Sequence, residues 1–246
     1  MKPAREPGAI SLVLRSLLFS LGFWVVTPPY AIFSVLLFPL PPIARYHMIS
    51  RWSRFILFWL KLTCRIEARI KRAGALPAGP AVIMAKHQST WETLALQTVF
   101  PPQTWVIKRE LLWIPFFGWG LGMLRPIAID RGAGRVALKQ VLEQGQDRLK
   151  KGLWVVIFPE GTRVAPGQRR RYGQGGARLA IEAQVDVVPV AHNAGEFWPR
   201  GGFIKRPGVI DVSIGAPISS RNTSPEALTA AVEQWIENEL LTLPKN

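Results

Sequence analysis

The chain has 246 residues, of which 48% are hydrophobic, and its 31 Lys and Arg against 16 Asp and Glu give a net charge of +15. This composition excludes a disordered chain, and the length allows one sizeable domain with its own core, or one domain and an appendage. One cysteine and three histidines exclude an intrachain disulfide and a thiolate cluster and argue against zinc, so we expect no metal. The positive charge favours anionic partners: nucleic acid, an acidic membrane surface or a phosphorylated substrate.

The first segment of the chain is apolar. Residues 9–27 approach the roughly 20 residues that cross a bilayer, with Arg15 as an interruption near the start. Pro28 and Pro29 predict the end of this helix, and residues 30–40 form a second apolar segment that is short for a span. A cleaved signal peptide is the alternative. The prolines and the second segment, where a small-residue cleavage site should be, favour a retained anchor.

Residues 51–69 mix aromatic and aliphatic side chains with basic ones. This pattern fits a basic amphipathic helix on an anionic membrane surface, and equally a helix packed on the domain with its charged face in water. The basic residues that flank the apolar segments indicate the cytoplasmic side of a membrane. We therefore expect residues 1–70 to form a membrane-associated helical region and residues 71–246 to form the globular domain.

The globular part alternates short apolar runs with helical patterns. Six runs have the length of buried strands, and most are rich in Val and Ile. They are residues 81–85, 104–107, 126–129, 153–158, 187–191 and 209–214. Helices are predicted at residues 135–150, at 175–183 and from Pro225 onward, the last with Ser224 as its N-cap. This alternation predicts an α/β fold with a largely parallel sheet flanked by helices, whose site residues gather at the carboxyl ends of strands.

The first predicted strand end carries the sequence K-H-Q-S-T-W-E, Lys86 to Glu92. On one continuous helix, His87 and Glu92 would point about 140° apart, so a turn must intervene for them to meet. Ser89 and Glu92 have the spacing of a capping box, which supplies such a turn. Glu92 either closes this cap alone or also accepts a hydrogen bond from His87, and the spacing leaves both interpretations open.

Other predicted strand ends also carry polar residues. In F-P-E-G-T-R, Phe158 to Arg163, Gly161 permits a tight turn, and Arg163 with nearby backbone N–H groups suits an anion. Residues 108–119 begin with a cation and continue as an aromatic, proline-broken stretch, and an Asp-Arg pair at residues 130–131 follows a fourth strand. Taken singly, these motifs are also compatible with a surface turn, core packing and a surface ion pair.

In this order and spacing, the motifs together resemble the four blocks of the glycerolipid acyltransferases, most closely the bacterial 1-acyl-sn-glycerol-3-phosphate acyltransferases. The resemblance covers about residues 80–215. The first block is matched by His87 and Glu92, the second by Lys108, Glu110, Leu111, Pro115 and Gly118, the third by Phe158 to Arg163, and the fourth by Val188, Pro189 and Val190. The sequence departs from the usual first block, because the acid is Glu92 where Asp is commoner and Lys86 stands where Asn often precedes the His.

The resemblance implies transfer of a fatty acyl group from a thioester, on acyl carrier protein or coenzyme A, to the sn-2 hydroxyl of 1-acyl-sn-glycerol-3-phosphate. The product would be phosphatidic acid, and no cofactor beyond the thioester co-substrate is expected. His87 is then the general base, since imidazole is neutral and basic near physiological pH, and Glu92 orients it. No enzyme nucleophile is needed, because the substrate supplies the hydroxyl.

The resemblance also implies a phosphate site. Lys108 and Arg163 are the candidates to hold the phosphate, and Arg131 is a further one. Glu160 is expected to hold Arg163 or the local turn, and Gly161 to allow close backbone approach, with Thr162 beside them in the same motif. Residues 113–123 are expected to line the acyl path or to dip into the bilayer.

The expected partners are a lysophospholipid acceptor, the thioester donor and an anionic membrane surface, here the inner membrane of a bacterium with the catalytic domain on its cytoplasmic face. Two alternatives remain. One keeps the fold and changes the acceptor to a lyso-ornithine lipid or glycerol-3-phosphate. The other is a basic nucleic-acid-binding protein, which the apolar N-terminus and the lack of a recognisable binding motif disfavour, so no nucleic acid is expected.

Overall fold

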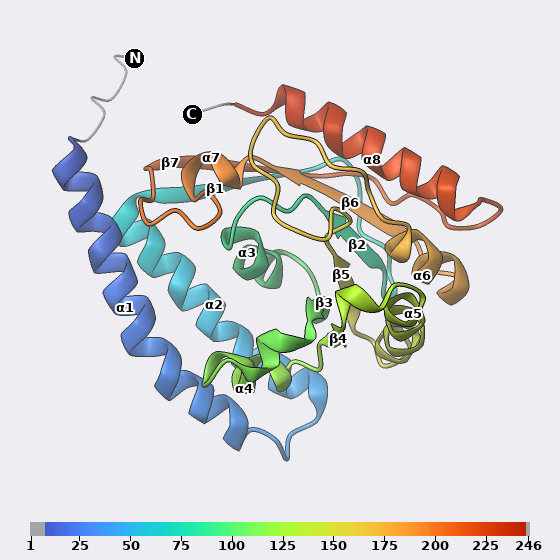
Figure 1. The fold of residues 1–246 in the computed structure, drawn as a ribbon, viewed down its shortest axis with the longest axis horizontal. Helices are drawn as coiled ribbons and strands as arrows, with labels where there is room; N and C mark the ends of the chain where they lie inside the picture. Colours follow the sequence, from blue (N-terminus) through green and yellow to red (C-terminus); the bar gives the residue numbers. More distant parts are fainter. Residues whose placement is uncertain (1–7, 245–246) are drawn as a thin grey trace.

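A computed structural model describes residues 8–244, and its centre is a seven-stranded sheet in the order β1-β7-β6-β2-β5-β3-β4 (Figure 1). Neighbouring strands are parallel except β6 and β7, so β1 and β7 run opposite to the other five. The strands are β1 (Ile66–Arg72), β2 (Val82–Ala85), β3 (Gln103–Lys108), β4 (Ile127–Ile129), β5 (Trp154–Ile157), β6 (Val187–His192) and β7 (Gly208–Ile214). The predicted α/β fold with a largely parallel sheet is confirmed.

Helices cover both faces of this sheet. β2, β5 and β6 are buried along their whole length, which explains why they are continuous apolar runs and do not alternate. One face packs against α2 (Pro42–Cys64) and α3 (Trp91–Val99), and the other against α5 (Arg135–Lys150), α6 (Gly175–Ala183) and α8 (Pro225–Thr242). The shorter helices are η1 (Arg109–Trp113), α4 (Phe117–Gly122), η2 (Arg131–Ala133) and α7 (Ala194–Phe197).

The predicted start of the last helix is confirmed. Ser224 has extended backbone geometry, and its Oγ accepts a hydrogen bond from the Ala227 amide at 3.1 Å. Pro225 occupies the first helical position, where its missing N–H costs no hydrogen bond.

The first helix, α1 (Ala9–Leu36), runs straight through Pro28 and Pro29, so the prediction that these prolines end it is wrong. The prolines remove two N–H donors, but contacts within and around the helix hold it. The Thr27 hydroxyl donates to the Phe23 carbonyl at 2.6 Å, and the Tyr30 hydroxyl donates to the Met48 carbonyl of α2 at 2.6 Å. Residues 30–40 are therefore mostly a continuation of α1, because neighbouring helices and side-chain hydroxyls stabilise prolines in apolar helices.

The predicted helix over residues 51–69 ends early. α2 stops at Cys64, Arg65 adopts a left-handed conformation (φ 56°), and β1 begins at Ile66 and pairs with β7. The expected division at residues 70 and 71 falls inside this strand. One face of α2 is buried through residues such as Ile56. Its outer face mixes exposed apolar and basic side chains, so features of both interpretations of this helix occur together.

Among the described residues, α1 is the one helix long and apolar enough to cross a membrane, and 11% of its most apolar stretch is buried in the protein. Its outward side chains include Leu14, Leu21 and Trp24. Trp113 and Trp119, in η1 and α4, are also exposed. Trp is typical of membrane–water interfaces, where its ring is half buried and its N–H stays hydrated.

Candidate active site

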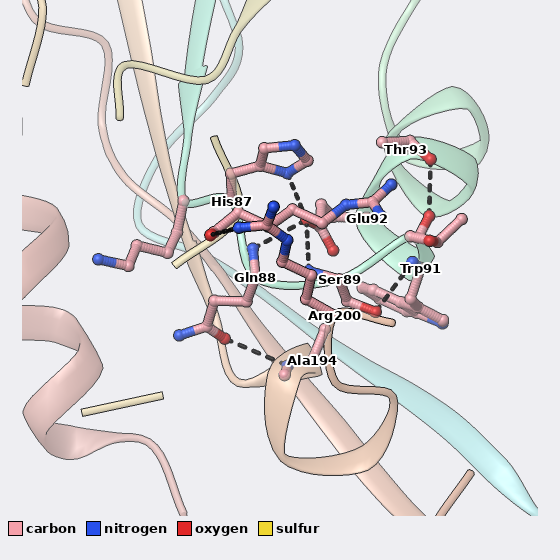
Figure 2. Close-up of polar contacts among 12 residues, drawn as sticks. His87, Gln88, Ser89, Trp91, Glu92, Thr93, Ala194 and Arg200 are labelled. Atoms are coloured by element: carbon pink, nitrogen blue, oxygen red, sulfur yellow. Dashed lines mark hydrogen bonds and ion pairs between the residues drawn. The ribbon is translucent and has the colours of Figure 1, made fainter. Parts of the chain in front are cut away.

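The loop after β2 brings His87 and Glu92 together (Figure 2), with His87 Nδ1 donating to Glu92 Oε1 at 2.8 Å. The same oxygen accepts the backbone amides of Gln88 and Ser89 at 3.0 and 2.8 Å. Glu92 sits in the first turn of α3 and is fully buried. The two interpretations of Glu92 are therefore both correct as geometry: this carboxylate binds the amides that precede the helix and also the imidazole.

Ser89 takes a structural position beside this pair. Its Oγ accepts the Trp91 amide at 3.1 Å and donates its proton to the Trp198 carbonyl at 2.6 Å. The hydroxyl is fully buried, and it both donates and accepts a hydrogen bond. This arrangement provides no base to activate Ser89 as a nucleophile.

The face of the His87 ring also makes a packing contact. The imidazole stacks on Phe158 with 4.0 Å between ring centroids and 14° between planes. Since Nδ1 faces Glu92, the proton of the neutral ring sits there and Nε2 is free to accept one. No described residue hydrogen-bonds Nε2, and His87 lines a mostly apolar cavity. A substrate hydroxyl in that cavity can therefore reach a basic nitrogen.

A second histidine, His192 at the end of β6, supports the pair from behind. Its Nε2 donates to the Lys86 carbonyl at 2.8 Å, and its Nδ1 accepts the Ala194 amide at 3.2 Å. Burial lowers the pKa of His192, which keeps this ring neutral. Its Nε2 also lies 4.0 Å from Glu92 Oε2. His192 was missed in the sequence, although this polar residue comes two positions after the Val188-Pro189-Val190 run.

Glu92 is ionised in this setting. Burial alone would raise its pKa, but the hydrogen bonds from His87 and from the Ser89 amide help to hold the pKa below its ordinary value. A buried carboxylate with three hydrogen-bond donors on one oxygen is well placed to stabilise an imidazolium at His87.

The Phe158–Arg163 turn is fastened to the His87 loop, because the Val164 amide donates to the His87 carbonyl at 2.8 Å. Gly161 has φ 69°, a conformation that side chains disfavour, so the turn requires glycine there. Arg163 lines the same cavity as His87. Burial lowers the pKa of the Arg163 guanidinium, Arg200 adds to this effect, and Glu92 opposes it.

Glu160 was expected to hold Arg163 or the local turn, and it forms no ion pair with Arg163. Its buried carboxylate lies 3.1 Å from Lys86 Nζ, which also pairs with Glu237 of α8 at 2.8 Å. The Tyr172 hydroxyl donates to the same Glu237 oxygen at 3.0 Å. Lys86 is itself buried, because its side chain turns from the end of β2 into the interior, where only carboxylates can balance its charge.

Replacing Glu160 with glutamine should make stability less sensitive to pH. Burial raises the pKa of Glu160 to about 7, from an ordinary value of 4.5, and Lys86 offsets part of the rise. The folded state therefore binds this proton more tightly than the unfolded chain. Its stabilising contribution is full below pH 4.5 and is lost as the pH rises to about 7. The loss amounts to as much as about 3 kcal/mol in the wild type and is absent in Glu160→Gln.

Denaturation midpoints of the two proteins in one detergent, at several pH values between about 5 and 8, measure this difference. Glu143→Gln, at an exposed position of α5, is the matched control. Curves for Glu160→Gln and wild type that stay parallel across this range would contradict the prediction.

The remaining predicted site residues are more scattered. Lys108 ends β3 with its side chain half exposed, 3.1 Å from Glu110, and does not line the cavity. Thr162 Oγ1 accepts from Arg200 Nη1 at 3.5 Å. Arg131 begins η2, and its side chain lies outside the described part of the structure. The structure thus places His87 and Arg163 at one cavity, with Glu92 buried beside His87, and leaves Lys108 outside the cavity.

The cavity has a volume of about 280 Å³. It lies between the N-terminal helices and the end of the sheet where β2 leads into the His87 loop. Its lining is mostly apolar and comes from α1, α2, α3, β3, η1 and α4. Phe117 and Leu121 line it, whereas Trp113 and Trp119 from the same stretch are exposed. Each buried CH₂ of a hydrocarbon chain gains about 0.8 kcal/mol, so an apolar cavity of this kind suits an acyl chain. No cluster of metal-ligating side chains occurs among the described residues.

The arrangement of His87, Glu92 and Arg163 at this apolar cavity is compatible with acyl transfer. The chain belongs to the acyltransferase family: the family model described as Acyltransferase matches residues 62–193. A 1-acyl-sn-glycerol-3-phosphate acyltransferase from Pseudomonas aeruginosa is 42% identical over 237 residues, which cover 94% of this chain and 91% of that protein.

More distant relatives agree. The mouse 1-acyl-sn-glycerol-3-phosphate acyltransferase alpha is 28% identical over 194 residues, covering 77% of this chain and 68% of that protein. The crystal structure of the 1-acyl-sn-glycerophosphate (LPA) acyltransferase PlsC from Thermotoga maritima has a TM-score of 0.79 at 21% identity. It covers 96% of this chain and 98% of that one, and shows the shared fold.

Proposed function

We propose that the protein transfers a fatty acyl group from an acyl thioester to the sn-2 hydroxyl of 1-acyl-sn-glycerol-3-phosphate, which forms phosphatidic acid. The observation that carries this proposal is that His87, paired with Glu92, and Arg163 line one apolar cavity. Such a site offers a base for the hydroxyl, a cation for the phosphate and space for a hydrocarbon chain. The names of the curated relatives, at up to 42% identity, support the same acceptor.

In the proposed mechanism, His87 Nε2 takes the proton of the acceptor hydroxyl as the oxygen attacks the thioester carbonyl. The imidazolium that forms is stabilised by ionised Glu92, which also fixes the tautomer through Nδ1. The tetrahedral intermediate then releases the thiolate, and the same imidazolium returns its proton to the departing sulfur. The ester replaces the thioester, and His87 ends neutral.

The donor is proposed to be acyl carrier protein or coenzyme A carrying the acyl group, with no further cofactor. The apolar N-terminal helix and the bacterial relative indicate association with a membrane. We place the protein at the bacterial inner membrane with the catalytic domain on the cytoplasmic face. The net charge of +15 favours an anionic membrane surface.

An acceptor panel tests the proposed function. Purified enzyme is incubated with 1-acyl-sn-glycerol-3-phosphate, glycerol-3-phosphate and a lyso-ornithine lipid, each with both thioester donors, and the products are identified by mass. We expect phosphatidic acid from the first acceptor at the highest kcat/KM. Transfer to another acceptor with none to the first would overturn the proposal.

Replacing Arg163 with alanine should raise the KM for the phosphorylated acceptor by about tenfold or more, because a charge-assisted bond to phosphate is lost. The KM for the thioester donor should stay within about twofold. Initial rates with each substrate varied in turn measure both values. An effect on the donor alone would place the phosphate elsewhere.

Lys108→Ala is the matched comparison, because this cation is outside the cavity. Its effect on the acceptor KM should be smaller than that of Arg163→Ala. An equal or larger effect would place the phosphate nearer the end of β3.

A further inference from the structure

A second guanidinium, that of Arg200, lies beside Arg163 and belongs to none of the four sequence blocks. Arg200 follows α7 in the connection to β7. Its Nη1 donates to the Arg163 carbonyl at 3.2 Å and to Thr162 Oγ1 at 3.5 Å. Figure 2 draws it among the residues around His87 and Glu92. The Arg200 side chain is exposed and does not itself line the cavity, but these two bonds attach it to the turn that carries Arg163, which does line it.

Neither guanidinium group forms a direct ion pair in the part of the chain that the structure describes, where no carboxylate lies within 4.0 Å of Arg163 or Arg200. Glu92 acts on the Arg163 charge from a longer distance. Burial lowers the pKa of the Arg163 guanidinium, and the charge of Arg200 lowers it further. Two like charges near one reaction site are stabilised when an anion binds to both of them.

The contacts of Arg200 leave it able to bind such an anion. Both of its hydrogen bonds to the protein come from Nη1, which leaves the N–H groups of Nη2 and Nε without a described protein partner. A guanidinium presents its donors in a planar fork that matches two phosphate oxygens. The bonds through Nη1 anchor the group to the backbone next to Arg163.

We propose that Arg200 binds the acceptor phosphate together with Arg163, and that this pair selects a doubly charged phosphate monoester over a singly charged diester. The inference rests on the proposed function, because it concerns the acceptor of that reaction. The reacting hydroxyl and the phosphate of such an acceptor sit on neighbouring carbons. A hydroxyl at His87 therefore places the phosphate a few bonds away, in the cavity that Arg163 also lines.

Three variants separate the charge of Arg200 from its contact with the Arg163 backbone. Arg200→Gln keeps a donor for that carbonyl and removes the charge, whereas Arg200→Lys keeps the charge and loses the fork. Arg206→Gln removes an exposed arginine from the same connection and is the matched control. Initial rates of the full chain in detergent micelles, with 1-acyl-sn-glycerol-3-phosphate or the thioester donor varied, give the KM values. Melting curves check that each variant is folded.

We expect Arg200→Gln to raise the KM for the phosphorylated acceptor about tenfold, with the donor KM within about twofold of wild type. Arg200→Lys should lie between wild type and Arg200→Gln. The second ionisation of a phosphate monoester lies near pH 6, so the wild-type acceptor KM should fall as the pH rises through that value. This fall should be smaller in Arg200→Gln, a readout that a purely structural role would not change.

An acceptor KM and pH profile in Arg200→Gln that match those of Arg206→Gln would overturn the role of Arg200. If Arg163→Ala still raised the acceptor KM in that case, the proposed function would stand without Arg200. Wild-type enzyme that does not acylate 1-acyl-sn-glycerol-3-phosphate at all would instead overturn the proposed function itself.

Discussion

Replacing His87 with alanine should lower kcat by about 10³- to 10⁴-fold, while the thermal midpoint changes little. The large effect is expected because one imidazole serves both proton transfers, and general acid–base catalysis contributes up to about 10⁴-fold. The His87 side chain lies at the cavity surface and is not part of the hydrophobic core. Initial rates at saturating donor and acceptor measure the loss.

Two further variants sharpen this result. His87→Gln keeps a hydrogen-bond donor for Glu92 but cannot accept and return a proton, so its kcat should fall as far as that of His87→Ala. His47→Ala removes an exposed histidine of α2 and should leave kcat unchanged. A His87→Ala enzyme with near-normal turnover would rule out the proposed proton transfer.

Glu92→Gln should lower kcat by about 10²- to 10³-fold, because the imidazolium at His87 would lose a buried negative partner. Removing one member of a buried charge pair costs about 3–5 kcal/mol, and each 1.36 kcal/mol at the barrier is a factor of ten in rate. The tautomer itself should survive. Three donors meet at Oε1, namely His87 Nδ1 and the amides of Gln88 and Ser89, and they hold a glutamine with its oxygen in that place.

Melting temperatures distinguish the capping role of Glu92 from its role in stabilising the His87 imidazolium. Because glutamine keeps the oxygen that binds the two amides, the melting temperature of Glu92→Gln should change much less than its kcat. Glu92→Ala removes the acceptor as well and should lose both stability and activity. A Glu92→Gln enzyme that melts lower but turns over at the wild-type rate would show that the residue only caps α3.

Those elements whose pattern is local and regular could be predicted from the sequence. α5 and α6 match their predicted ranges, and Ser224 caps α8 as expected. β1 was missed although Ile66–Arg72 alternates apolar and charged residues, because only Ile66 of this strand is buried and the preceding helix extends the apolar pattern. The course of α1 through its prolines depends on packing against α2, which no local signal reports.

Within the site, too, the contacts between residues close in sequence could be predicted, and those between distant residues could not. His87 and Glu92 are five residues apart, so their spacing and the turn between them indicate the contact. Glu237 meets Lys86 across 151 residues, and Arg200 meets the Arg163 carbonyl across 37. Such contacts are made by the order of the strands and the packing of α8. Sequence spacing therefore carries no trace of them.

The wall that α1 contributes to the cavity limits how the protein can be shortened. Phe23, Tyr30 and Ala31 line the cavity from the same helix that turns Leu14, Leu21 and Trp24 outward. A chain trimmed to begin at α2 would lose this wall, and its cavity would be more open to solvent. Water entering the widened cavity would compete with the lipid alcohol for the thioester and favour hydrolysis. The helix that is apolar enough to cross a membrane also forms part of the cavity wall, so removing α1 would change both membrane association and the cavity.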